Sequence, residues 1–446
     1  MTARKCRRIV YSIMPTLYPH QAAGVEWLAA HPRALLADEQ GLGKTAQAIL
    51  AADRVGARTL MVVAPAAVTH NWRRELRTWS KRSEAQILAR GTDLVLGSTV
   101  IVSHDLVRSP KLLAQLCSPW DAIIVDEAHG FKNPSAQRTK ALYGKQGAGG
   151  IVEHGKHVWA LTGTPTPNDP SELYTMIAAL SPDRIRTRSG RVLSPAGFAE
   201  RYCQIDFRGR VCGVKNKAEL HQRLRGFGLR RTKADVLDLP PVRHGRVLLS
   251  SDDVDPKVLA ELLELESKID VEALLAGRET ESFSRWRRLC GAAKAKPAAE
   301  VIADELDNGL ENLVVFGHHR DVLDTIEARL VGYGVVRIAG EVSAAGRQKA
   351  VDDFQARRAR VALCQLVAGG VGITLTAAAD VCFVEQSFSP GQNAQAMDRL
   401  HRIGQGKSVL VRRFVLEGSV DDVVDETLER KRRTLEDLST VDHAAG

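Results

Sequence analysis

Apolar and polar positions along the chain follow two different spacings. Short apolar runs typical of buried strands alternate with segments whose apolar residues recur at helical spacing. In the first half the strand-like runs end at Ala37, Ala64, Val102, Val125 and Leu161, and helical patterns such as 44–53 and 68–79 lie between several of them. A repeated strand-then-helix order is typical of a parallel sheet with crossover helices. The first half therefore predicts one α/β lobe.

The second half repeats this order. Its strand-like runs are 313–316, 335–338, 361–365 and 381–384, and its helical segments are 321–330, 345–355 and 392–401. The whole pattern predicts an α/β fold with two parallel-sheet lobes in tandem. A last helix is expected to begin at Ser419, because a hydroxyl followed three residues later by an acid, Asp422, has a capping-box-like spacing.

Residues 165–297, between the two halves, show weaker alternation, more charge and a break at Pro240-Pro241. We interpret this stretch as mainly helical insertions and a linker. The expected domains are lobe 1 at residues 1–240, with an insertion at about 166–240, and lobe 2 at residues 241–446, with an insertion at about 250–297.

Composition narrows the class of protein without naming a function. The 446 residues are 44% hydrophobic and 26% charged, and no apolar run approaches the ~20 residues that cross a bilayer. We therefore expect a soluble intracellular protein without a membrane partner, in cytoplasm, nucleoid or nucleus. Lys and Arg outnumber Asp and Glu by 62 to 53, a net charge of +9, which modestly favours a polyanion such as nucleic acid. Seven cysteines with no C-x-x-C pair predict free thiols.

A glycine-rich turn, Ala-Asp-Glu-Gln-Gly-Leu-Gly-Lys-Thr, follows the first predicted strand and opens a helix. In that position backbone N–H groups can surround phosphates, and Gly41 and Gly43 let the backbone approach them closely. Lys44 would reach the β- and γ-phosphates of ATP, and the Thr45 hydroxyl would bind Mg²⁺. Asp38 stands where the common phosphate-loop pattern has its first glycine, so the pattern alone has moderate specificity.

Two adjacent acids end a later apolar strand, in the run Ile-Ile-Val-Asp-Glu-Ala-His. Ligands of open α/β sheets lie at the carboxyl ends of strands. Asp126 would hold Mg²⁺, directly or through water, and Glu127 would polarise the attacking water. Such a pair alone is usually a solvated strand end, but together with a phosphate loop upstream it indicates ATP hydrolysis.

A pair of arginines occurs in the second half, in the run Gln-Ala-Met-Asp-Arg-Leu-His-Arg-Ile-Gly-Gln. On a helix, Arg399 and Arg402 would lie three residues apart and point the same way. If they face the phosphate loop of the other lobe, they can neutralise charge that builds on the γ-phosphate, as arginine fingers do. The sequence thus predicts an ATP site shared by both lobes.

These motifs resemble those of Swi/Snf-type helicase-like ATPases, which belong to the larger superfamily-two helicases and contain a DEAH box and two RecA-like lobes. The resemblance covers nearly the whole chain. Its matching segments are, in order, 17–28, 38–45, 63–75, 126–133, 161–168, 229–240, 368–376 and 395–405. Gln40 stands where methionine is common in the family. Residues 314–319 and the short intervening region look nearest to the compact annealing-helicase branch.

The resemblance implies a DNA-dependent ATPase that uses ATP and Mg²⁺ to translocate on DNA, double-stranded by preference, and remodels DNA or protein–DNA complexes as a monomeric motor. It implies that Gln21 lies against adenine and that Gly372 contributes to nucleotide binding. It also implies nucleic-acid contacts from Pro65, Ser103, Gly369 and Thr374. It names no protein partner.

Two other functions remain open from the residues. An RNA or single-stranded-DNA helicase would share the same ATP site, although the segments 131–133 and 229–236 argue against the RNA helicase. A nucleic-acid-binding module without turnover would fit the charge, but it would not need Lys44, Asp126 and Glu127 together.

Two further patterns have ordinary structural interpretations. The basic run 285–288 predicts a helix with Trp286 buried and its arginines solvated, rather than a nucleic-acid contact. The histidine pairs 154/157 and 318/319 lack the cysteine or acid companions of a zinc site, so satisfied or solvated imidazoles are expected.

Overall fold

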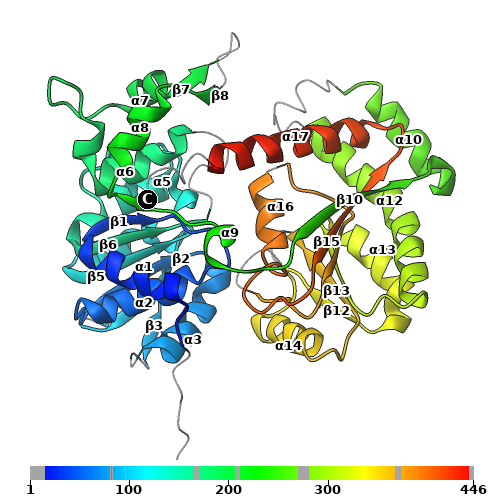
Figure 1. The fold of residues 1–446 in the computed structure, drawn as a ribbon, viewed down its shortest axis with the longest axis horizontal. Helices are drawn as coiled ribbons and strands as arrows, with labels where there is room; N and C mark the ends of the chain where they lie inside the picture. The colour runs from blue at the N-terminus through cyan, green and yellow to red at the C-terminus, as the bar shows by residue number, and fades with distance from the viewer. Residues whose placement is uncertain are drawn as a thin grey trace, which may run out of the picture.

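The computed structural model describes residues 16–80, 82, 84–95, 97–163, 170–205, 211–269, 281–366, 373–388 and 390–440. Two sheets lie side by side, each with helices packed on it (Figure 1). The prediction of an α/β fold with two parallel-sheet lobes in tandem is confirmed. Cys117, Cys203, Cys290, Cys364 and Cys382 are free thiols, and all of these except Cys117 are buried.

Lobe 1 contains a seven-stranded sheet in the order β3-β4-β2-β5-β6-β1-β9, and its pairings are all parallel. Its strands are β1 (Arg33–Leu36), β2 (Leu60–Ala64), β3 (Ala85–Ile87), β4 (Thr99–Ser103), β5 (Trp120–Asp126), β6 (Gly155–Leu161) and β9 (Gly228–Leu229). Strands β2 and β4 are buried along their whole length, because a hydrophobic core lies on each face of the sheet. This burial on both faces explains their unbroken apolar runs.

The helices of lobe 1 include those that carry the expected motifs. They are α1 (Pro19–Ala30), α2 (Lys44–Arg54), α3 (Thr69–Trp79), α4 (Pro110–Leu116), α5 (Gln137–Tyr143) and α6 (Tyr174–Leu180). The predicted insertion contains α7 (Pro195–Tyr202), the antiparallel pair β7 (Cys203–Ile205) and β8 (Val211–Val214), α8 (Lys217–Leu224) and α9 (Lys233–Val236). In Figure 1, α9 lies between the two sheets.

Lobe 2 contains a six-stranded parallel sheet in the order β10-β15-β14-β11-β13-β12. Its strands are β10 (Val242–Leu249), β11 (Leu313–Gly317), β12 (Val335–Ile338), β13 (Val361–Gln365), β14 (Asp380–Phe383) and β15 (Val409–Leu416). Its helices include α10 (Pro256–Glu266), α12 (Glu281–Asp307), α13 (Arg320–Leu330), α14 (Ala344–Gln355), α16 (Pro390–Met397) and α17 (Val420–Thr440). No strand is shared with lobe 1, so we propose the boundary near residue 240.

Two predictions about elements of lobe 2 were wrong. The helix predicted at 392–401 ends at Met397, because the N–H groups of Arg399 and Leu400 bond three residues back in tight turns, to the carbonyls of Ala396 and Met397. Arg399 and Arg402 therefore lie in the turns after α16, not on it. Strand β10 lies within the expected lobe 2, in the weakly alternating stretch where no strand was predicted, and it forms the edge of the sheet. The last helix begins at Val420, one residue later than predicted. Ser419 directly precedes it, and its Oγ accepts the Asp421 N–H at 3.1 Å.

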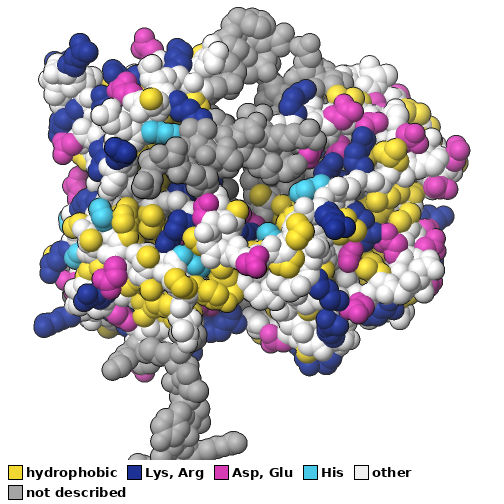
Figure 2. Space-filling view, viewed as in Figure 1, with side chains coloured by type: hydrophobic (Ala, Val, Ile, Leu, Met, Phe, Trp, Pro, Cys, Tyr) yellow, Lys and Arg dark blue, Asp and Glu magenta, His cyan; other side chains and the backbone are white. Residues whose placement is uncertain are grey.

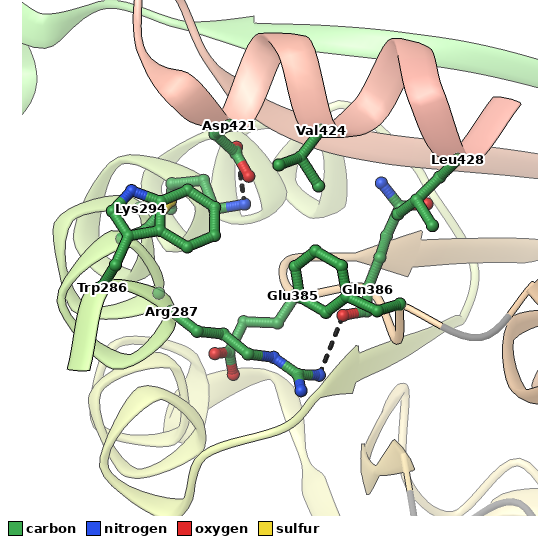
Figure 3. A pocket seen from close by; sticks show the side chains of 11 residues that line it. Trp286, Arg287, Lys294, Glu385, Gln386, Asp421, Val424 and Leu428 are labelled. Atoms are coloured by element: carbon green, nitrogen blue, oxygen red, sulfur yellow. Dashed lines mark hydrogen bonds and ion pairs between the residues drawn. The ribbon is translucent and has the colours of Figure 1, made fainter. Parts of the chain in front are cut away.

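The basic run 285–288 has the predicted buried tryptophan and two solvated arginines, but Arg287 is half-buried: its Nη2 donates to the carbonyl of Gln386 at 2.9 Å, and its guanidinium lies over the Phe388 ring. Trp286 is buried in the lobe 2 core, whereas Arg285 and Arg288 form exposed ion pairs with acids of neighbouring helices. Trp286 lines a cavity of about 20 Å³ beneath α17 (Figure 3), which is room for one water molecule. This space is too small for a substrate.

The surface adds two general observations. Figure 2 shows acidic and basic side chains interspersed over the visible face of lobe 2, so on this face the net charge of +9 is not gathered in one basic field. Within the described part of the chain, none of the helices combines the length and apolarity needed to cross a bilayer.

Candidate active site

The predicted phosphate loop lies between β1 and α2, as its sequence indicated. Gly41 and Gly43 have φ of 89° and 78°, in the left-handed region that favours glycine. A Cβ on Gly43 would lie 2.2 Å from Nε2 of Gln21. Gln21 is buried on α1, and its Nε2 donates to the carbonyl of Leu42 at 3.3 Å. The glutamine thus contacts the loop directly, and only glycine fits at position 43.

Lys44 opens α2 and turns its ammonium back into the loop. Its Nζ donates to the carbonyls of Asp38 and Glu39 at 2.6 and 3.2 Å. Desolvation lowers the pKa of Lys44, and the negative charges of Glu127, Asp38, Asp126 and Asp398 offset part of this effect. The ammonium therefore lies among carbonyl and carboxylate oxygens, an environment in which phosphate oxygens could replace the carbonyls.

Asp38, the residue in place of the first glycine of the common pattern, has a structural role. Its side chain is fully buried, and the guanidinium of Arg231 binds both carboxylate oxygens, with Nε 2.9 Å from Oδ1. Nη2 of Arg231 also donates to Gln47 Oε1 at 2.8 Å, and Gln47 Nε2 donates to Asp38 Oδ2 at 3.1 Å. A buried carboxylate needs such partners. They tie the loop to the segment that follows β9.

Asp126 ends β5 and lies half-buried near the loop. Its Oδ2 accepts the indole N–H of Trp72 at 2.7 Å, and its Oδ1 accepts the N–H of Glu127 at 3.0 Å. Desolvation and the charge of Glu127 raise the pKa of Asp126 to about 6, despite the opposing effects of Trp72 and Lys44. Nε2 of His104 lies 2.9 Å from the Asp126 carbonyl oxygen. A cation beside this carboxylate would stabilise its charged form.

Glu127 has a strained backbone, with φ 46° and ψ 51°, in a region that non-glycine residues rarely adopt. Its Oε2 lies 3.3 Å from His129 Nδ1, and the same nitrogen lies 3.0 Å from Thr162 Oγ1 at the end of β6. Desolvation alone would raise the pKa of Glu127, but His129, Lys44 and Arg399 together lower it below its usual range. The carboxylate is thus kept charged, as a group that polarises water must be.

Lobe 2 places both predicted arginines against this site. A Cβ on Gly41 would lie 3.1 Å from Cβ of Arg402. Arg399 is half-buried, and desolvation together with the charge of Arg402 lowers its pKa to about 10, while Glu127, Asp398 and Asp126 act in the opposite direction. Desolvation likewise lowers the pKa of Arg402. Two neighbouring, desolvated cations create a site that favours an anion.

The donor set of lobe 1 fits a magnesium ion. The hydroxyl of Thr45 and the carboxylate of Asp126 supply the oxygen ligands that Mg²⁺ prefers. Thr45 follows Lys44 at the start of α2, and Asp126 acts electrostatically on Lys44, so the two candidate ligands border the same lysine. The raised pKa of Asp126 is consistent with a carboxylate that a divalent cation would stabilise.

The residues expected to contact nucleic acid are only partly placed. Pro65 follows β2, and Ser103, which is buried, ends the adjacent β4, where it pairs with Ala64. Thr374 lies on lobe 2 beside Ile373, whose carbonyl accepts from Arg402 Nη1 at 3.3 Å. Gly369 and Gly372 lie outside the described residues.

Several site residues had no role in the sequence prediction. Trp72, Arg231, Lys233 and Asp398 all stood in quoted motifs, yet nothing local indicated what they contact. For Arg231 one signal was present: an acid, Asp38, inside a phosphate loop demands a cationic partner. Arg231 lies 193 residues after Asp38 in the sequence, so no local pattern could identify it as the partner.

A comparison with protein families matches residues 20–285 to the SNF2-related domain. The chain belongs to the SNF2-related family. A second match, to the helicase conserved C-terminal domain, covers residues 297–404. Together the two matched domains contain the phosphate loop, both acids and both arginines.

Relatives of this SNF2-related chain are larger proteins. It is 34% identical over 433 residues to the SWI/SNF-related matrix-associated actin-dependent regulator of chromatin subfamily A-like protein 1 of Xenopus tropicalis, covering 94% of this chain and 44% of that protein. It is 31% identical to the DNA annealing helicase and endonuclease ZRANB3 of Homo sapiens, covering 93% of this chain and 40% of that protein. The chain therefore spans less than half the length of these relatives.

Among solved structures, the chain is similar to the Sulfolobus solfataricus SWI2/SNF2 ATPase core in complex with dsDNA. The sequence identity is 22% and the TM-score is 0.45, with 96% of this chain and 94% of the other covered.

Proposed function

We propose that this chain is an ATP-dependent motor that hydrolyses ATP to ADP and phosphate and moves along DNA, double-stranded by preference. One observation carries the ATPase part of the proposal: two desolvated arginines of lobe 2 lie at the lobe 1 site, Arg399 within electrostatic reach of Glu127 and Asp126, and Arg402 packed against Gly41 of the phosphate loop. A binding module without turnover would have no use for this arrangement. The DNA part is supported by family membership and by the name of one relative, a DNA annealing helicase.

In the proposed reaction each side chain has one task. Gln21 lies against the adenine, and backbone N–H groups of the loop surround the phosphates. Lys44 exchanges its contacts with the Asp38 and Glu39 carbonyls for oxygens of the β- and γ-phosphates. Glu127 accepts a hydrogen bond from the attacking water and aims it at the γ-phosphorus.

The arginines act on the charge that develops during transfer. As the bond from the γ-phosphorus to the leaving oxygen lengthens, negative charge grows on the transferred group and on ADP. Arg399 and Arg402 stabilise this charge from lobe 2. Mg²⁺, held by Thr45 and Asp126, supplies neutralisation of the phosphate charge when it is bound.

Hydrolysis and movement are coupled because the site is complete only while the lobes are together. ATP favours closure, and loss of phosphate weakens the bridge between loop and arginines, so the lobes separate again. If residues near Pro65 and Ser103 on lobe 1 and Thr374 on lobe 2 hold the phosphates of one DNA strand, each cycle moves one lobe relative to the other along that strand.

The test is ATP hydrolysis measured with double-stranded DNA, single-stranded DNA or RNA, together with displacement of the third strand from a DNA triplex. Stimulation chiefly by the duplex, with ATP-dependent triplex displacement, is the expected result. Stimulation chiefly by RNA or single strands would replace the proposal with an unwinding helicase. Absence of hydrolysis with every nucleic acid would overturn it.

A further inference from the structure

The segment after β9 had no role in the proposed function, although it touches both lobes. It leaves the lobe 1 sheet at Leu229, and its Arg231 is bound to Asp38 of the phosphate loop. The short helix α9 follows at once and lies between the two sheets (Figure 1). The segment is therefore bound to the phosphate loop on one side and faces lobe 2 on the other.

Lys233, the first residue of α9, joins the loop to lobe 2. Its backbone N–H donates to Glu39 Oε2 at 2.7 Å, and its ammonium lies 3.6 Å from Glu39 Oε1. The same ammonium donates to Oδ1 of Asp398 in lobe 2. The Lys233 side chain is 5% exposed and that of Asp398 is 12% exposed. Their contact is thus a nearly dry ion pair between lobes.

This burial distinguishes the pair from an exposed hydrogen bond that also joins the lobes. Arg74 on α3 donates to Gln348 on α14 at 3.3 Å, but both side chains are exposed. Solvent-exposed polar contacts of this kind contribute little to holding two lobes together. By contrast, loss of one partner of a buried pair leaves an uncompensated charge, which strongly disfavours the arrangement. The Lys233–Asp398 pair can therefore decide whether the lobes stay together.

Asp398 also lies at the centre of the catalytic cations. It is adjacent in sequence to Arg399, and its negative charge acts on Lys44, Arg399 and Arg402. It occupies the first residue after α16, where the chain turns away from the helix. Anchoring this carboxylate fixes the turn that carries both arginines.

We propose that Lys233 is a positioning residue: by pairing with Asp398 it holds the lobes in the closed arrangement and sets Arg399 and Arg402 against the phosphate loop. The inference deepens the proposed function and rests on it for its catalytic consequence. Lys233 does not touch the reacting atoms. Its effect on hydrolysis is exerted through Asp398 and the turn that follows α16.

The test compares wild type, Lys233→Met, Asp398→Asn and the double variant. Small-angle X-ray scattering without nucleotide, and with ADP and aluminium fluoride, measures lobe separation. We expect both single variants to be more open than wild type in either condition. Their kcat should fall roughly tenfold while KM for ATP changes little. A tenfold loss is of the size expected when the interaction between two contacting residues is removed. The double variant should lose no more than the more impaired single variant, because it removes both charges and leaves neither uncompensated.

A matched control is available within lobe 2. Lys294 Nζ donates to Asp421 at 2.8 Å, with side-chain exposures of 5% and 13% (Figure 3). Lys294→Met breaks a pair of the same kind and burial, but inside one lobe. It should lower thermal stability without opening the lobes in scattering experiments.

The outcomes separate the two proposals. Unchanged scattering of Lys233→Met, or additive losses in the double variant, would overturn the positioning role. If wild type failed to hydrolyse ATP at all, the proposed function would fall. The nucleotide-free scattering comparison would still show whether this pair holds the lobes together.

Discussion

The indole N–H of Trp72 donates to Oδ2 of Asp126 at 2.7 Å, which joins helix α3 to the acid at the end of β5. Trp72 is buried, while its neighbour on α3, Arg74, is exposed. One side of the helix thus holds the candidate magnesium ligand and another faces solvent.

Trp72→Phe should raise the Mg²⁺ concentration needed for half-maximal ATP hydrolysis about tenfold, as expected when a group that orients a metal ligand is lost. Phenylalanine keeps most of the apolar contact but lacks the N–H donor. Binding of a fluorescent ADP analogue at several Mg²⁺ concentrations provides a second readout. Trp120→Phe is the control. Trp120 begins β5, the strand that Asp126 ends, but its indole N–H donates to the carbonyl of Leu116 at 2.9 Å, away from the site. Equal effects of both variants would refute a specific role for Trp72.

Lys44→Ala and Glu127→Gln should fail at different steps. The alanine variant lacks the ammonium that would meet the phosphates, so nucleotide binding should be lost. The glutamine variant keeps the shape of the side chain but cannot carry the charge that polarises water. It should bind ATP with near-normal affinity and hydrolyse it at least a hundredfold more slowly. Equilibrium binding and single-turnover hydrolysis distinguish the two defects.

Arg402→Ala should lower kcat by roughly 10³ with little change in ATP affinity, because an arginine finger acts mainly on the transition state. Steady-state hydrolysis with saturating duplex DNA measures the loss. Arg285→Ala, which removes an exposed ion pair with Glu261, is the matched control and should retain full turnover. Normal turnover of the Arg402 variant would remove the inter-lobe role of this residue.

Arg231→Met should destabilise lobe 1 by about 3 kcal/mol, since it leaves the buried Asp38 carboxylate without its cation. Calorimetry should show the lobe 1 transition shifted down by roughly 5–10 °C. Adding Asp38→Asn to this variant removes the unpaired charge and should restore part of the loss. A double variant no more stable than Arg231→Met would show that the ion pair is not the cause.

His104 should make lobe 1 sensitive to mild acid. Burial lowers its pKa from 6.5 to about 4, so as pH falls below 6.5 the unfolded chain takes up a proton before the folded one does. The free energy of unfolding of lobe 1 is therefore highest above pH 6.5 and falls by about 2 kcal/mol by pH 5. Below the folded pKa of about 4, His104 causes no further loss.

His104→Gln offers the comparison, because glutamine can still donate to the Asp126 carbonyl but does not titrate in this range. Thermal unfolding from pH 7.5 to 5.0 should show a steeper loss for wild type than for the variant. Parallel curves would mean that His104 is not the group responsible.

The sequence predicted the central strands well because they are buried on both faces. The ends of β2 and β13 coincide with the ends of apolar runs. Strand β10 was not predicted as a strand, because its burial alternates and much of it is exposed. A strand with such alternating burial has no unbroken apolar run to reveal it.

The phosphate loop and acid pair could be located from sequence because each is a local pattern between a strand and a turn or helix. The contacts that join them could not. After Met397 the chain leaves α16 in tight turns, and the carbonyl of Arg399 accepts the N–H of Leu375. No helical periodicity contains that information. Similarly, the partners of Asp38 and Asp126 come from distant segments that only the folded chain brings together.

The pairing of β10 with β15 has a consequence for biosynthesis. Residues 242–249 bond along their whole length to residues 409–416, whereas the strands of lobe 1 all lie before residue 230. On the ribosome, lobe 1 can complete its sheet early, while the first strand of lobe 2 must wait, unpaired, until its neighbour emerges. During that interval β10 exposes a free edge, and it is there that chaperones would be most needed.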